Sequence, residues 1–197
     1  EGAQLSSRVA VLIGIFAVVC VAYGDGAVFN IKDGVTDWTV RESYDEEAVP
    51  DAGDIVNIPA GYTVVVSNDS SFAKVSSLNR IAPQSSTSTI IFDVADDTVR
   101  TNGAAIRGTN SSYGFVIKRG KGELAFTSVE RFLSGQTCND YRVGNITVEE
   151  GTLRMQVAAP KREYAFETVA ISNNATFVLP TKGSTGGGSF FAWCSYL

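Results

Sequence analysis

The stretch ITVEEGTLRMQV, residues 146–157, places apolar side chains at alternate positions on both sides of a Glu-Glu-Gly break. A period of two is typical of strands that bury one face. Glycine in the break accepts a positive φ, so the chain can bend there at little cost. The stretch therefore predicts two short strands joined by a bend. The side chains expected to point into a core are Ile146, Val148, Leu153, Met155 and Val157.

Three other stretches repeat this pattern: VNIPAGYTVVV at 56–66, FVIKRGKGELAF at 115–126 and VAISNNATFVL at 169–179. Each has two alternating runs around a break that contains Gly or Asn. Glu-Glu stands where the other copies have Pro-Ala, Lys-Arg and Asn-Asn, which indicates a water-exposed corner rather than a catalytic pair. Two folds explain the repetition: hairpins in an antiparallel β-sandwich, or turns of an all-β parallel solenoid in which equivalent copies stack.

The spacing of the strand-like runs favours the solenoid. The intervals between successive runs are 19, 15, 25, 31 and 23 residues, and a solenoid turn takes roughly 20 to 30. The runs begin near Val56, Val75, Ile90, Phe115, Ile146 and Val169. The largest protruding loop is expected at 128–143, and helical patterns are nearly absent after the N-terminal segment. Antiparallel pairing of 146–148 with 169–171 would exclude the solenoid.

Residues 120–155 resemble the autotransporter-associated β-strand repeat. Gly120, Gly122 and Leu124 match its opening, residues 143–148 match its strand, and the Gly-Thr-Leu at 151–153 matches its closure. The loop departs from the family, because FLSGQTCNDY stands where Thr-Tyr-Thr-Gly-Gly is usual.

Residues 38–69 are similar to the opening segment of large secreted bacterial β-helix proteins. The matching residues are Trp38, Pro50, Ala52, Gly53, Asp54, Pro59, Ala60 and Gly61. Together the two resemblances imply a right-handed parallel β-helix in a secreted or surface protein. They imply no catalytic residues.

The N-terminal segment is typical of a targeting signal. Arg8 precedes an apolar run at 9–23, followed by small residues. That run is shorter than the roughly 20 residues of a membrane-spanning helix, although an uncleaved anchor is the alternative. We therefore expect a signal peptide or anchor at 1–24, an N-terminal cap segment at 25–54 and β-helix turns at 55–197. The apolar ending at 186–197 is expected to start another turn of a longer chain, and the alternative is a strand that docks back onto the core. Cys138 and Cys194 either pair or stay free thiols.

Composition excludes several classes of function. The chain has no histidine, which removes His-based catalytic triads and His-ligated metal sites. Its formal net charge is -5, which argues against nucleic acid as a partner. The cysteines lack metal-ligand spacing. We predict no catalytic residues, no cofactor, no metal, and no membrane contact for the mature domain.

The remaining charged and aromatic groups are interpreted as structural. Carboxylate clusters can bind calcium or cleave glycosides, but here they are expected to be solvated turn charges. They comprise Asp45, Glu46 and Glu47; Asp51 and Asp54; and Asp93, Asp96 and Asp97. Asp54 is also expected to order its turn by accepting backbone N–H bonds. Lys118, Arg119 and Lys121 are placed in an exposed turn. Trp38, Tyr44 and Tyr62 either stack on sugars or, as we expect for Trp38, cap the end of the core.

These observations predict a non-enzymatic, secreted or surface-displayed β-solenoid, such as a passenger, stalk or adhesin-like segment. Its partners would be surface glycans or other proteins. The alternative is a carbohydrate-binding or carbohydrate-cleaving β-helix. An enzyme of that kind needs a groove lined by two carboxylates, or by a carboxylate with Lys or Arg.

Overall fold

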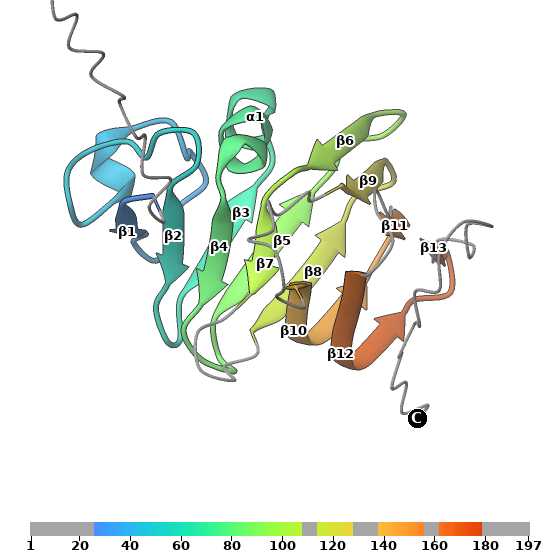
Figure 1. Ribbon diagram of the computed structural model, residues 1–197. Helices are drawn as coiled ribbons and strands as arrows, with labels where there is room; N and C mark the ends of the chain where they lie inside the picture. The colour runs from blue at the N-terminus through green and yellow to red at the C-terminus, as the bar shows by residue number, and fades with distance from the viewer. Residues whose placement is uncertain (1–25, 108–113, 128–137, 156–161, 179–197) are drawn as a thin grey trace, which may run out of the picture.

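A computed structural model describes residues 26–107, 114–127, 138–155 and 162–178 (Figure 1). Throughout these ranges the chain winds into a parallel β-solenoid, as the spacing predicts. Ile146 pairs with Val169 and Val148 with Ile171 in parallel register, which excludes the antiparallel sandwich. Partners in adjacent turns are 23 positions (Tyr141 and Tyr164) to 35 positions (Ile106 and Tyr141) apart.

The turns present three faces. The first face holds β1 (Val28–Asn30), β2 (Ile55–Ile58), β4 (Arg80–Pro83) and β7 (Ala105–Arg107), and the second holds β3 (Thr63–Val66), β5 (Thr89–Asp93) and β8 (Phe115–Arg119). The third face holds β6 (Val99–Asn102), β9 (Glu123–Phe126), β11 (Gly151–Met155) and β13 (Ala175–Val178). The long strands β10 (Cys138–Val148) and β12 (Arg162–Ile171) run across the first and second faces, since β10 pairs with both β7 and β8.

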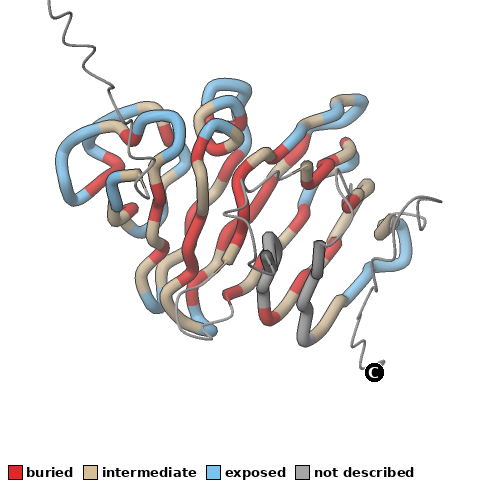
Figure 2. Tube along the Cα trace, in the orientation of Figure 1, coloured by how far each residue is buried: buried red, intermediate tan, exposed pale blue. Residues whose placement is uncertain are grey.

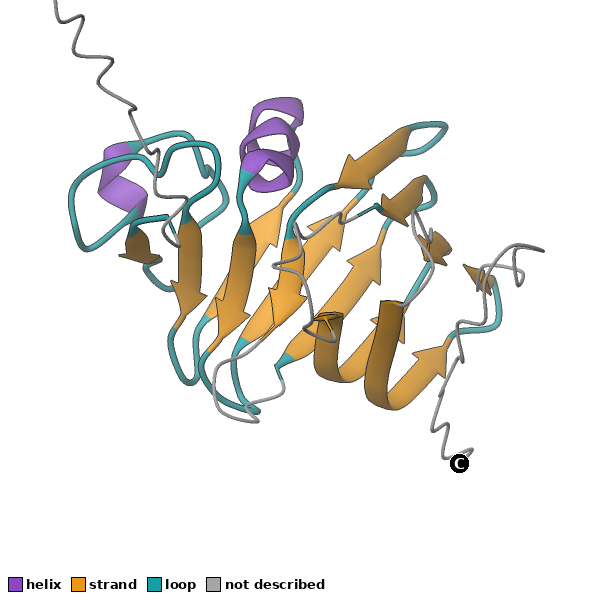
Figure 3. Ribbon diagram, viewed as in Figure 1, coloured by secondary structure: helices purple, strands orange, loops and turns teal. Residues whose placement is uncertain are grey.

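A helix, α1 (Asp69–Ser77), packs beside β6 where the following turns carry a third-face strand (Figure 3). The described chain contains little helix, as expected, but the strand expected to begin near Val75 is wrong, because this residue lies in α1. Asn68 caps the helix by accepting a hydrogen bond from the Ser71 N–H at 2.8 Å. Phe72 and Val75, three positions apart, bury one helical side in the core.

The structure corrects which stretches are equivalent. Three copies, β8–β9, β10–β11 and β12–β13, stack at the corner between the second and third faces. The copy at 56–66 instead forms the corner between the first and second faces. The fourth stacked copy is β5–β6, which the alternation missed because Arg100 occupies the register position of Leu124.

The boundary of the expected loop at 128–143 is also wrong. Strand β10 begins at Cys138, so the last part of that stretch is extended chain rather than loop. Residues 128–137 lie outside the described ranges, as do the N-terminal segment, Val157 and Cys194.

Buried apolar side chains fill the interior from Ile31 to Met155, and Val169, Ala175 and Phe177 of the last described turn pack against them while partly buried. The buried positions follow one another from turn to turn along the chain (Figure 2). Ile146, Val148, Leu153 and Met155 are buried, which confirms the inward positions deduced from the repeat. At the N-terminal end, Trp38 and Tyr44 are fully buried near the short 3-10 helix η1 (Arg41–Ser43). Trp38 Nε1 donates to the Val65 carbonyl at 2.9 Å, and the Tyr44 hydroxyl donates to the Trp38 carbonyl at 2.8 Å. Neither ring can therefore stack on a sugar.

Asp54 orders the turn before β2, as expected from its position. Its carboxylate accepts hydrogen bonds from the Ala27 N–H at 2.9 Å and from the Asp51 N–H at 2.7 Å. Among the described residues, no helix has the length and apolar character needed to cross a bilayer.

Candidate functional site

The corner between the second and third faces brings the Arg119 side chain next to the Glu-Glu pair at 149–150. We call it the stacked corner and define it by residues 119–122, 149–151 and 172–174. Gly120 and Gly151 adopt positive φ angles of 75° and 69° there. A Cβ atom on Gly151 would lie 2.5 Å from the Gly122 carbonyl oxygen and 2.6 Å from that of Gly120. The backbones of the two adjacent turns are therefore in direct contact here, with no room for a side chain at Gly151.

Lys118 is buried beneath this corner, which corrects its placement in an exposed turn. Its side chain occupies the register position of Phe92 and Val148 in the neighbouring turns. Its Nζ donates hydrogen bonds to the carbonyl oxygens of Arg119 and Glu150, each at 3.0 Å, and also to that of Gly120. One ammonium group thus joins two successive turns from the inside.

Burial lowers the pKa of the Lys118 amine, because the charged form loses hydration, and the nearby carboxylates of Asp93 and Glu150 oppose this shift. Between the lowered pKa and the ordinary value of 10.5, the unfolded chain binds more protons than the folded one. Stability from this group therefore rises with pH in that window. We expect the unfolding free energy of the wild type, minus that of Lys118→Met, to increase as pH rises toward 10.5. Urea unfolding at a series of alkaline pH values measures this difference, and a constant or falling difference would contradict the assignment.

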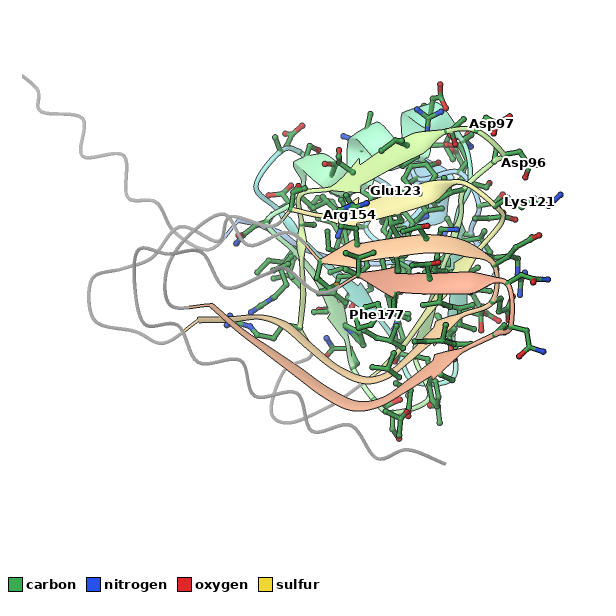
Figure 4. The ribbon with its side chains drawn as sticks, turned by 90° about the vertical axis from the view of Figure 1, so that its right-hand side faces the viewer. Asp96, Asp97, Lys121, Glu123, Arg154 and Phe177 are labelled. Carbon is green, nitrogen blue, oxygen red and sulfur yellow. The ribbon has the colours of Figure 1, made fainter. Side chains whose placement is uncertain are left out.

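The other charges of the region pair across adjacent turns. Arg119 Nε donates to Glu149 at 2.8 Å, and Lys121 lies 3.5 Å from Asp96. On the third face, Arg154 makes two bonds to Glu123, at 2.6 and 3.1 Å (Figure 4). The hydrogen bond donated by Arg154 lowers the pKa of Glu123, and donation to Glu149 and to Glu123 raises the pKa values of Arg119 and Arg154, respectively.

A polar hollow of about 480 Å³ opens on the stacked corner, lined by Arg119, Glu149, Glu150, Ser172, Asn173 and Asn174. It brings two carboxylates and an arginine together, which is one feature expected of a carbohydrate-active site. However, Arg119 and Glu149 satisfy each other, and the hollow lies at a corner rather than along a face. Its hydroxyl, amide and carboxylate groups can exchange hydrogen bonds with a polar ligand.

The remaining acidic groups are separate. Glu46 accepts hydrogen bonds from the backbone and side chain of Asn30, and Asp97 turns the chain with a φ of 57°. Within the described ranges, no three His, Cys, Asp or Glu side chains lie close enough together to hold a metal ion. Tyr62 packs, partly buried, against the core.

A ladder of side-chain amides on the first face escaped the sequence analysis. Asn57 Nδ2 donates to Asn30 Oδ1 at 3.2 Å, and Gln84 Nε2 donates to Asn57 Oδ1 at 2.8 Å. Asn30 and Asn57 are register partners. Asn30 and Asn57 are 27 positions apart, which is close to the length of one turn, and this spacing could have predicted that the two amides stack.

Comparison with known proteins adds no relative: no family model, no curated protein and no solved structure matches this chain.

Proposed function

We propose that this protein is a non-enzymatic, exported β-solenoid module that acts as a passenger, stalk or adhesin-like segment. The observation that carries the proposal is that basic side chains bind groups of the protein's own neighbouring turns. Arg119, Lys121 and Arg154 each pair with a carboxylate of an adjacent turn, and Lys118 binds backbone carbonyls inside the stack. The partnered side chains hold the turns in register, a role that suits a rigid spacer.

Deleting the N-terminal segment tests whether the protein is exported. In a bacterial host, the full chain is expected outside the cytoplasm, whereas a variant lacking residues 1–24 should remain inside. Replacing those residues with a proven secretory signal is the matched control and should restore export. Retention of the full chain in the cytoplasm, while the control is exported, would contradict the proposal.

A carbohydrate-binding module is the second candidate, and the hollow on the stacked corner is the observation that favours it. Sugar hydroxyls are suitable partners for its mixed donors and acceptors. Selective binding on a glycan array, weakened by Asn174→Ala, would support this candidate. A complete absence of binding would count against it.

A further inference from the structure

The two ends of the solenoid differ in whether their strand edges are paired. At the N-terminal end, the segment around Tyr44 runs antiparallel to the end of β1 and closes its outer edge. The Lys32 N–H donates to the Ser43 carbonyl at 2.9 Å, and the Asp45 N–H donates to the Asn30 carbonyl at 3.0 Å. At the other end, within the described ranges, β12 pairs only with β10 and β13 only with β11 (Figure 1).

The hydrogen bonds of β12 show which backbone groups face this second end. The Ser172 N–H donates to the Val148 carbonyl at 3.0 Å. Alternate residues of a parallel strand point their N–H and C=O groups to the same neighbour, so those of Val169 and Ile171 point away from β10. Their register partners, Ile146 and Val148, point the same way and there meet β12. The outer edge of β12 therefore presents the same donors and acceptors to which β12 itself is paired on β10.

The apolar interior is also incompletely covered at this end. Ile146 is 1% exposed and Val148 is fully buried, whereas Ile171, the register partner of Val148, is 50% exposed. Val169, the partner of Ile146, is only partly buried. An exposed apolar surface beside an unpaired strand edge favours the addition of a further strand.

One segment of the chain, SFFAWCSYL at 189–197, matches this end in position and composition. It lies outside the described ranges. Partners in the last two described turns are 23 positions (Ile146 and Val169) or 24 positions (Leu153 and Phe177) apart. The same intervals, counted from the end of β12, lead to residues 193–195. The uninterrupted apolar run at 190–194 is typical of a strand with both faces covered.

The length of chain before this segment is suitable as well. Earlier turns pass from the third face to the next strand through residues 127–137 and 156–161. Residues 179–188 are intermediate in number between those two connections, and the glycines at 186–188 allow the chain to turn. Residues 189–197 can therefore reach the outer edge of β12 through a connection of ordinary length.

We infer that the end of the stack formed by β12 and β13 is the binding site for residues 189–197 of the same chain, which pair in parallel with β12 as the first strand of a further turn. The pairing uses the outward N–H and C=O groups of Val169 and Ile171 and covers the Ile171 side chain. The stack is thereby extended at this end alone, because the outer edge of β1 is already paired.

Disulfide formation tests this pairing in the full chain. With Cys20→Ser and Cys138→Ser, Cys194 is the single remaining thiol. Register partners on adjacent strands lie about 4.8 Å apart, within the range that a disulfide spans. Mild oxidation should join Cys194 to Ile171→Cys if the interval is 23 positions, and to Ala170→Cys if it is 24.

Val28→Cys is the matched control, because Val28 and Ile171 are 51% and 50% exposed and Val28 lies in β1 at the opposite end. It should not be joined to Cys194. Equal joining of this control, or joining of neither Ile171→Cys nor Ala170→Cys, would overturn the proposal. A disulfide between two molecules would overturn it too, since a second copy would then cover this end.

Hydrogen exchange distinguishes a paired strand from a segment that is only tethered nearby. The Val169 and Ile171 amides should exchange at least about tenfold faster in Trp193→Asp than in the wild type, because a charge cannot be buried cheaply in the added strand. Ser184→Asp places the same charge in the connection and should leave their exchange unchanged. Circular dichroism confirms that each variant remains folded. Equal exchange in Trp193→Asp and the wild type would contradict the pairing.

Discussion

Gly151→Ala is expected to destabilise the protein by about 2–6 kcal/mol, because two costs combine. The residue has a φ of 69°, where a non-glycine residue costs about 1–3 kcal/mol. The new Cβ would also meet the Gly122 carbonyl oxygen at 2.5 Å, and overpacking of this kind costs about 1–3 kcal/mol more. Since the obstructing atoms belong to the backbone of the next turn, no side-chain rotation can relieve the overlap.

Gly61→Ala is the matched control for this substitution. Gly61 has a φ of 80°, but a Cβ added there would have no neighbour within 4 Å. Its cost should therefore be the conformational one alone, about 1–3 kcal/mol. Denaturant unfolding of both variants measures the two losses. Equal losses would show that close stacking at the corner contributes nothing.

Trp38→Ala is expected to cost about 3–5 kcal/mol, as is usual when a large buried aromatic side chain is removed. Trp38 is fully buried and its indole N–H bonds to the Val65 carbonyl. Removing the side chain opens the N-terminal end of the core, so the variant should also self-associate. Chemical unfolding and light scattering measure the two effects.

Val40→Ala controls for position in the same segment. The Val40 side chain is 39% exposed, so its truncation should change stability by less than about 0.5 kcal/mol. If Trp38→Ala were no more destabilising than Val40→Ala, Trp38 would not close the core.

Alternation along the sequence was sufficient to predict the inward residues and, together with spacing, the parallel stack. The same alternation did not predict a strand where a single polar residue interrupts the apolar pattern. Arg100 fills an inward register position of β6, so that strand did not resemble its neighbours. Helix α1 was missed because Phe72 and Val75 stand among serines, whose own preference for helix interiors is weak.

The prediction that Lys118 lies in an exposed turn was wrong for a different reason. The period of two that places Val116 inward also places Lys118 inward, yet a charged side chain at a strand end suggests solvent. Its buried ammonium is satisfied by the nearby carbonyls of Arg119 and Gly120 and by that of Glu150, which lies 32 positions away. Such a partner can be identified only once the register between turns is known. The ion pairs between adjacent turns could not be predicted from the sequence for the same reason.

The spread of turn lengths, from 23 to 35 positions between partners, bears on how such a chain tolerates insertions and deletions. Residues gained or lost between strands leave the pairing of the neighbouring turns unchanged, because each turn touches only those beside it. One residue gained or lost inside a strand would reverse which side chains face inward from that point to its end. Natural length variation among related chains, and deliberate grafting, should therefore be confined to the connections between strands.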